Sequence, residues 1–313
     1  MELMSAMKPR PEQTLIEEVA LARNMAEVFV EKDWFVTQAI AAISAIDYQG
    51  FEVVFSGGTA LANAHDLLQR FSEDVDFRLL VPENMQRRKA RSGYKKALVD
   101  SLRQAGFSIE DSDVRARDEN QFFAIDLGYE SYFERVGALR PHIQVELKAI
   151  VPQLSPIYLP VSSFIHALGK IPPEVARVAC IDPVESAADK ISALAWRIPD
   201  RVRGSERDDP AIVRHIHDLA ILKDRALAHP RFRELVASAM QEDDDRPKNN
   251  PSFSGTPMSQ KLQRMLAVLE ADAEYAREYA DFVESVSYAP EGAAPDFTTA
   301  IQAVRVLADA IAA

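Results

Sequence analysis

Two short segments decide the fold of this chain: Phe55-Ser-Gly-Gly-Thr-Ala-Leu61 and Arg70-Phe-Ser-Glu-Asp-Val-Asp-Phe77. The first segment places a glycine pair between an expected strand at residues 51–55 and an expected helix at residues 59–69. A glycine pair at this position lets backbone N–H groups approach an anion, and the helix dipole favours negative charge there. The segment therefore predicts an anion site, in which Thr59 either caps the helix or contacts a phosphate oxygen.

The second segment predicts a strand that carries two carboxylates. Residues 72–80 alternate apolar and polar side chains, so Asp74 and Asp76 point to the same face. Two carboxylates on one face repel each other unless a cation lies between them, and Mg²⁺ binds one or two carboxylates together with phosphate oxygens. A lone glycine pair is usually a turn, and a lone Asp-x-Asp is usually a solvated strand face. The combination is far more specific, and it predicts a metal–triphosphate site.

The remaining sequence predicts an α+β fold. Helical spacing indicates two helices in residues 12–47 and a strongly basic helix at 84–105. The proline-rich residues 152–183 show no clear period, and we expect them to wrap around the core. Further strands are expected at 107–111, 122–129 and 142–150.

From Pro183 onward the chain reads as helical. Helices are expected at 184–200, 210–224, 230–241, 258–285 and 296–312, with a mobile loop at 241–260. We therefore expect three parts: N-terminal helices that pack on the core (1–50), a small mixed-sheet α/β core (51–182), and a helical domain that completes the active site (183–313).

Composition excludes several classes of protein. The 313 residues contain one cysteine, 36 basic and 48 acidic side chains, for a net charge of −12. One cysteine excludes a disulfide framework, and no apolar run approaches the roughly 20 residues that span a bilayer. The N-terminus has no apolar signal region, so we expect a cytoplasmic protein with no membrane association. The acidic balance speaks against a protein that coats nucleic acid.

The helix at 84–105 has the opposite charge. This helix contains one acidic residue, Asp100, and seven basic residues. The basic residues are Arg87, Arg88, Lys89, Arg91, Lys95, Lys96 and Arg103. It follows directly on the carboxylate strand, so it either steers a triphosphate or RNA toward the site or forms an ordinary solvated face.

The glycine–carboxylate signature resembles that of the AbiEii/AbiGii toxin family, within the nucleotidyltransferase superfamily that shares the DNA polymerase β catalytic fold. The signature reads Gly57-Gly58-Thr59-x-Leu61, then Arg70-x-Ser72-x-Asp74-x-Asp76. Four further segments resemble family motifs: Glu31-Lys-Asp-Trp34, Ile143-Gln-Val-Glu146-Leu, Asp189-Lys190-Ile-x-Ala-Leu194 and Arg214-His-Ile-His-Asp218-Leu219. The resemblance covers about residues 27–222. His215 stands where many relatives carry an acid, which bears on the nucleotide preference and the acceptor.

The resemblance implies a set of site residues. The implied catalytic residues are Asp74, Asp76, Glu146, Lys190 and Asp218, of which Asp74, Asp76 and Glu146 hold metal. The implied nucleotide-binding residues are Ser56, Gly57, Gly58, Thr59, Ser72 and Lys190. Glu146 is either a third metal ligand or a general base, Lys190 neutralises the triphosphate, and Asp218 orients Lys190 or the nucleotide. From spacing alone, Glu146 could lie on a solvated strand and Asp218 could form a helical ion pair with Arg214.

The resemblance also implies a function. It is that of a Mg²⁺-dependent nucleotidyltransferase toxin of a bacterial toxin–antitoxin or phage-defence system. Two Mg²⁺ ions are implied, with Mn²⁺ as an alternative. The enzyme would transfer NMP from an NTP to an acceptor hydroxyl, the implied acceptor being the tRNA 3′ end and the implied partner an antitoxin encoded nearby. Two alternatives stay open: transfer to a small molecule or protein hydroxyl, and a non-catalytic nucleotide- or antitoxin-binding module. The presence of Asp74, Asp76 and Glu146 favours the enzyme.

Overall fold

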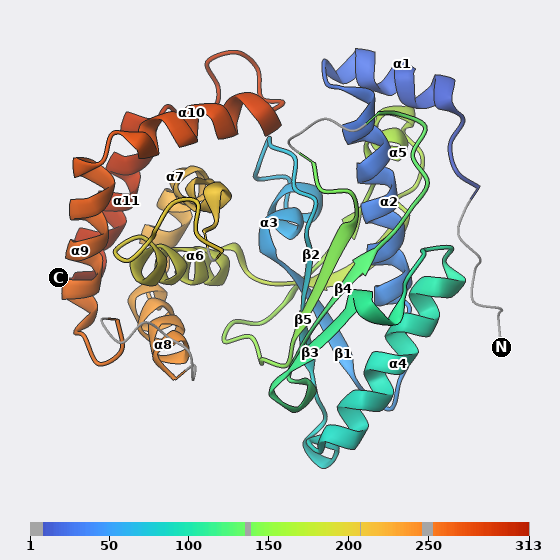
Figure 1. Cartoon of the computed structure of the whole chain (residues 1–313), viewed down its shortest axis with the longest axis horizontal. Helices are drawn as coiled ribbons and strands as arrows, with labels where there is room; N and C mark the ends of the chain where they lie inside the picture. The colour runs from blue at the N-terminus through green and yellow to red at the C-terminus, as the bar shows by residue number, and fades with distance from the viewer. Residues whose placement is uncertain (1–8, 135–138, 207, 246–252, 313) are drawn as a thin grey trace. The chain divides into compact units, whose positions relative to one another are not determined.

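The computed structural model describes residues 9–134, 139–206, 208–245 and 253–312 (Figure 1). The chain forms two compact units. The sheet unit comprises Met1–Asp66 and Phe71–Ile181, and the helical unit comprises Leu67–Arg70 and Asp182–Ala313. The segment Leu67–Arg70 thus belongs to the helical unit although it interrupts the sheet unit. The expected α+β architecture with a mixed sheet is confirmed.

The sheet unit is built on one seven-stranded sheet with the order β3-β4-β5-β2-β1-β7-β6. The pairs β2–β5 and β1–β7 are parallel, and the other neighbouring strands are antiparallel. The strands are β1 (Glu52–Ser56), β2 (Val75–Leu80), β3 (Val114–Arg117), β4 (Phe122–Leu127), β5 (Ile143–Lys148), β6 (Ile157–Val161) and β7 (Val175–Cys180). The strands that carry the candidate acids, β2 and β5, are therefore neighbours at the centre of the sheet.

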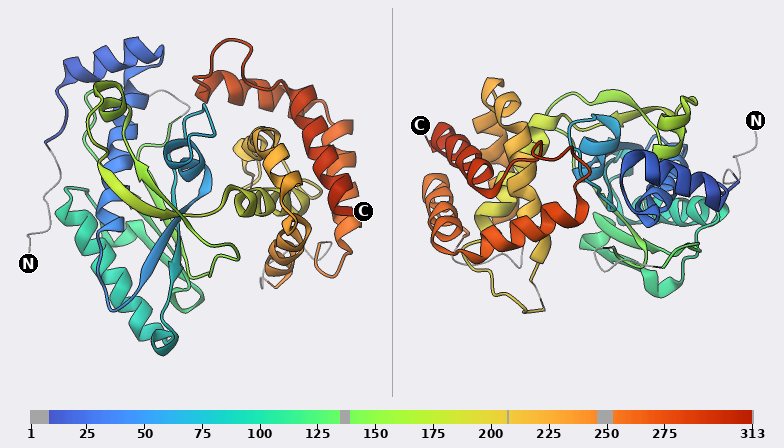
Figure 2. Two further views of the ribbon diagram at one scale, coloured as in Figure 1. Left: turned by 180° about the vertical axis from the view of Figure 1, so that it is seen from behind. Right: turned by 90° about the horizontal axis from the view of Figure 1, so that it is seen from above.

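Helices α2 (Glu27–Ser44) and α4 (Arg88–Gln104) cover one face of this sheet (Figures 1 and 2). Burial alternates along β2 and β5, where Val75, Phe77, Val145 and Leu147 are buried and the residues between them are partly exposed. Tyr94 of α4 lies over this buried face, with its ring centroid 6.4 Å from that of Phe123 in β4. The alternate residues, which include Asp76 and Glu146, therefore lie on the face opposite α4.

Three strands of the sheet lie where the sequence predicted none: β3, β6 and β7. Residues 152–183 were expected to be irregular, yet they form β6, α5 (Phe164–Gly169) and β7. Pro160 lies within β6, and β6 is an edge strand, where a missing backbone N–H is tolerated. The prolines and the shortness of the strands hide the period-two pattern.

The expectation of a strand at residues 107–111 is wrong. This segment makes one β-bridge, between Ser108 and Gly128. Glu110 and Asp113 form a reciprocal capping box around the 3₁₀ turn Asp111–Asp113, which starts a turn in place of a strand. The strand β3 begins only at Val114.

The helix expected at 59–69 is much shorter than predicted. It begins as α3 (Gly57–Thr59), continues as a single π-helical turn at Ala60–Ala64, and ends before Asp66, whose φ is 52°. The residues that follow, Leu67–Arg70, belong to the helical unit. The strand expected at 72–80 is β2 and begins at Val75, so Asp74 immediately precedes it.

The helical unit contains six named α-helices within its described residues: α6 (Pro183–Arg197), α7 (Arg214–Ala228), α8 (Phe232–Asp244), α9 (Met258–Ala271), α10 (Glu274–Val286) and α11 (Phe297–Ala312). The single helix expected at 258–285 is divided at Asp272, whose carboxylate accepts the N–H of Glu274 at 3.0 Å. The expected loop at 241–260 is partly helical, since α8 extends to Asp244, and residues 246–252 lie outside the described residues. In the described parts of the chain, none of the helices combines the length and the apolarity that a bilayer span requires.

Asp33 is a buried carboxylate that joins α2 to α5. It accepts hydrogen bonds from the backbone N–H of Phe164 (2.6 Å) and from the amide of Asn63 (2.9 Å). Burial raises the pKa of Asp33 to about 7, and the two hydrogen bonds oppose this rise only in part. The folded protein therefore binds a proton at Asp33 more tightly than an unfolded chain does.

We expect the wild-type protein to lose stability relative to Asp33→Asn as the pH rises from about 5 to about 8. Because the folded-state pKa is raised, the folded state binds more protons over this window, and the free energy of unfolding falls with pH. The rise from 3.8 to about 7 corresponds to a loss of ~3 kcal/mol across the window. Denaturant unfolding of both proteins across these pH values measures the difference, and parallel pH profiles would contradict it.

Candidate active site

The glycine turn lies directly against the carboxylate of Asp76. Gly57 has a φ of +76°, and a Cβ placed on it would lie 2.1 Å from Oδ2 of Asp76. Ser56, at the end of β1, is the register partner of Asp76 in β2. Position 57 therefore requires glycine for two reasons, the left-handed backbone and the close approach of the carboxylate.

The other predicted acids lie on the same sheet face. Asp76 is the register partner of Glu146 in the parallel pair β2–β5, so Ser56, Asp76 and Glu146 form a row across three neighbouring strands. Asp74 precedes Asp76 by two residues and is partly exposed, as Asp76 is. We name Asp74, Asp76 and Glu146 the carboxylate row.

The electrostatics of the carboxylate row fit a divalent cation. Burial raises the pKa of Glu146, and the negative charge of Asp74 raises it further, while Arg117, Arg140 and Arg115 act in the opposite direction. A cation between the carboxylates would relieve this repulsion, and oxygen donors are the ligands that Mg²⁺ prefers. Within the described residues, no three His, Cys, Asp or Glu side chains already stand at metal-binding distances. One or two carboxylates are enough for Mg²⁺, because water and phosphate oxygens complete its coordination.

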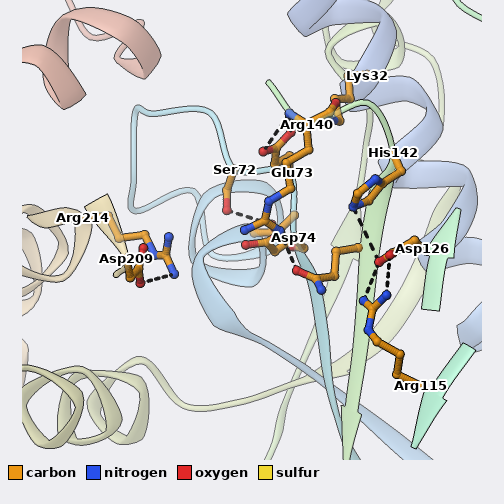
Figure 3. A network of polar contacts seen from close by, with 12 residues as sticks. Lys32, Ser72, Glu73, Asp74, Arg115, Asp126, Arg140, His142, Asp209 and Arg214 are labelled. Atoms are coloured by element: carbon orange, nitrogen blue, oxygen red, sulfur yellow. Dashed lines mark hydrogen bonds and ion pairs between the residues drawn. The ribbon is translucent and has the colours of Figure 1, made fainter. Parts of the chain in front are cut away.

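Arg140 is a residue of this site that sequence reasoning missed. Its guanidinium lies 2.5 Å from Oδ1 of Asp74 and donates to Gln144 at 2.6 Å (Figure 3). Glu73 accepts the backbone N–H of Arg140 at 3.1 Å and is ion-paired with buried Lys32, which donates to the carbonyl of Arg140 at 2.8 Å. This network holds the positively charged guanidinium of Arg140 beside the carboxylate of Asp74. A partner 66 residues away leaves no periodic signal in the sequence.

Thr59 uses its hydroxyl inside the protein. The side chain is fully buried, lies 3.0 Å from the hydroxyl of Ser72, and donates to the backbone carbonyl of Asp74. These contacts connect the end of α3 to Asp74, the first residue of the carboxylate row. Thr59 and Ser72 therefore connect the glycine turn to the acids.

The two remaining predicted catalytic residues lie together in the helical unit, Lys190 on α6 and Asp218 on α7. Asp218 is 0% exposed and accepts two hydrogen bonds of 2.7 Å from Arg70, and Lys190 Nζ lies 2.8 Å from its carboxylate. Burial alone would raise the pKa of Asp218, but Arg70 and Lys190 outweigh burial and hold the pKa well below its usual range. Arg70 belongs to the sequence signature, yet sequence reasoning assigned it no role.

His217, next to Asp218, is buried, and His215 is partly exposed. Burial, followed by the charges of Lys190 and Arg214, holds the pKa of His215 well below its usual value, so this imidazole is neutral. From spacing alone, Asp218 could have formed an ion pair with Arg214. In the structure, Arg214 pairs instead with Asp209, at 3.4 Å.

The basic helix is present as α4, and it covers the sheet face opposite the carboxylate row, which does not fit the steering alternative. Its Tyr94 packs toward Phe123, whereas Ala124, the next residue of β4, is the register partner of Glu146. Arg91 is buried and donates to the backbone carbonyl of Glu119 at 3.1 Å. The basic side chains of α4 therefore lie across the sheet from the carboxylate row.

We expect Gly57→Ala to destabilise the protein by about 1–3 kcal/mol and to abolish the nucleotide transfer that the family resemblance implies, because the added methyl group displaces Asp76 and strains the backbone. Gly204→Ala is the matched control: its φ is also positive (+73°), but no atom lies within 4 Å of the added Cβ. The control should lose stability from its backbone alone and keep its activity. Denaturant unfolding and a transfer assay measure both, and equal effects of the two substitutions would contradict the contact with Asp76.

Comparison with known proteins gives a family match and a structural match. A family model described as "Nucleotidyl transferase AbiEii toxin, Type IV TA system" matches residues 43–303. A comparison with curated proteins gives no match. Among solved structures, the chain is similar to MenT4, a nucleotidyltransferase toxin from Mycobacterium tuberculosis H37Rv, with a TM-score of 0.50 and 15% sequence identity over 95% of this chain and 99% of that chain. At 15% sequence identity, the similarity to MenT4 shows the fold alone. The family match spans most of the chain, and the chain belongs to the AbiEii nucleotidyltransferase toxin family of type IV toxin–antitoxin systems.

Proposed function

We propose that this nucleotidyltransferase carries out a Mg²⁺-dependent transfer of NMP from an NTP to the 3′-terminal hydroxyl of tRNA. The observation that carries the proposal is the contact of the Asp76 carboxylate with the Gly57 turn, in register with Glu146. This arrangement sets an anion-binding backbone beside hard oxygen ligands, which suits a metal-bound triphosphate.

Each site residue has a chemical role in this proposal. Asp74 and Asp76 would hold Mg²⁺, with Mn²⁺ as an alternative, and two such ions are proposed. The metal would supply charge neutralisation at the phosphates and lower the pKa of the acceptor hydroxyl. Ser56, Gly57 and Gly58 would donate to phosphate oxygens. The raised pKa of Glu146 suits it to accept the proton of the acceptor hydroxyl.

The helical unit would contribute the remaining charge. Lys190 would neutralise the triphosphate, and the 2.8 Å contact with Asp218 supports a role for Asp218 in orienting Lys190. We also propose the division into N-terminal helices, an α/β core and a helical domain at 1–50, 51–182 and 183–313. The toxin would act in the cytoplasm, in toxin–antitoxin or phage-defence biology, and the family implies an antitoxin as partner.

The test uses each of the four α-labelled NTPs with the purified protein, Mg²⁺ and total tRNA. We expect label to enter tRNA from one NTP or a subset of them. Periodate-oxidised tRNA, which lacks the terminal hydroxyls, and addition of EDTA should each abolish the signal. Label on a protein or on a small molecule would assign the acceptor to the alternative class. Label that persists on oxidised tRNA would refute transfer to the 3′ end.

A further inference from the structure

A second row of side chains lies two residues beyond the carboxylate row, on the same sheet face. Arg78 is the register partner of Lys148, Lys148 of Phe122, and Phe122 of Arg117. Because Arg78 follows Asp76 by two residues and Lys148 follows Glu146 by two, these side chains project from the same sheet face as the acids. We name Arg78, Lys148, Phe122 and Arg117 the basic row.

The basic row combines positive charge with an aromatic ring. The guanidinium of Arg117 lies 4.3 Å from the centroid of the Phe122 ring. Arg117 is exposed, and Phe122, Lys148 and Arg78 are partly exposed. Neighbouring strands are about 4.8 Å apart, so the four strands of the row give it a length of about 14 Å. These are the elements of a single-strand binding platform, in which cations contact phosphates and an aromatic ring stacks on a base.

Two neighbouring cations of the sheet unit, Arg115 and Arg140, bind carboxylates. Arg115 is bound by Asp126 through contacts of 2.5 and 2.7 Å, and Asp126 also lies 3.6 Å from His142 (Figure 3). Arg140 is engaged with Asp74. The basic side chains of α4 lie on the opposite face. The basic row adjoins the acids on their own sheet face, at the next register position of β2 and β5, and this position suits it to guide a phosphodiester chain to the carboxylates.

We propose that the basic row binds the single-stranded end of the RNA acceptor. Arg78 and Lys148 would contact its phosphates, and Phe122, supported by Arg117, would stack on a base. This inference rests on the proposed function, because it names the surface that presents the acceptor hydroxyl to the carboxylate row.

The test compares the wild type with Arg78→Gln/Lys148→Gln, and with Phe122→Leu, in the transfer assay. We expect the double variant to raise KM for tRNA at least about 10-fold and to leave KM for NTP unchanged. Loss of two phosphate contacts should also reduce the slope of log affinity against log salt by about 1.4. Phe122→Leu should raise KM for tRNA about 10-fold without changing the salt slope, because it removes stacking and no charge.

The matched control is Lys89→Gln/Lys96→Gln, which removes the same charge from exposed positions of α4 on the opposite face. It should leave both KM values within about twofold of wild type, and thermal unfolding should show that all variants are folded. A rise in KM for NTP alone would assign the row to the triphosphate and overturn the inference, as would equal losses in the control. If the wild type labels no RNA, the proposed function fails and the inference fails with it. If the wild type labels RNA and the row variants are unchanged, the inference alone fails.

Discussion

Asp76→Asn is expected to lower the rate of nucleotide transfer by at least about 10³-fold. Removing one preorganised electrostatic group from an active site typically causes a loss of this size. Asparagine keeps the size of the side chain that lies against Gly57. It removes the negative charge that a divalent cation needs and offers one neutral oxygen in place of a carboxylate. The variant should therefore be folded and should still contact the glycine turn, but it should lack the catalytic cation.

A single-turnover assay with saturating NTP and tRNA measures this loss, with circular dichroism and thermal unfolding as tests of folding. Asp126→Asn is the matched control, since it neutralises another partly exposed carboxylate of the same sheet unit, one that is paired with Arg115. It should keep activity within about threefold of wild type. An Asp76→Asn protein with more than about a tenth of wild-type activity would contradict the catalytic role of the carboxylate row.

Asp218→Ala is expected to lower the free energy of unfolding by about 3–5 kcal/mol, because it leaves two buried cations without their counter-charge. Arg70 is 3% exposed and Lys190 is 7% exposed, so water cannot replace the carboxylate. Arg70 is also four residues from Asp74 along the chain, and the substitution should therefore lower the rate of transfer as well.

Denaturant unfolding measures the loss of stability, and Asp209→Ala is the control. Asp209 is 30% exposed and pairs with Arg197 and Arg214, so its removal should cost less than about 1 kcal/mol. The double variant Arg70→Met/Asp218→Leu should be more stable than Asp218→Ala, because it removes one of the orphaned charges together with the acid. A loss below about 1 kcal/mol for Asp218→Ala would show that the cluster is not a buried ion network.

Local patterns in the sequence determined the core of the site. A glycine pair between a strand and a helix, and two acids spaced by two residues, depend on backbone geometry within a few residues. The structure accordingly places Gly57 against Asp76 and places Asp76 in register with Glu146. The same period of two also places Arg78 and Lys148 on this face, since each of them follows an acid by two residues.

Only the tertiary structure decided which residues face one another across the fold. Arg140 reaches Asp74 and Arg70 reaches Asp218 over long chain separations, and no local pattern encodes such a partner. The side of the sheet taken by α4 was equally undetermined, because a basic amphipathic helix can pack on either face, and packing of Tyr94 over Phe123 selects one of them. The sequence thus determined the type of site through short-range backbone preferences. Long-range packing decided which cations lie beside the carboxylates of that site and which form ion pairs elsewhere in the fold.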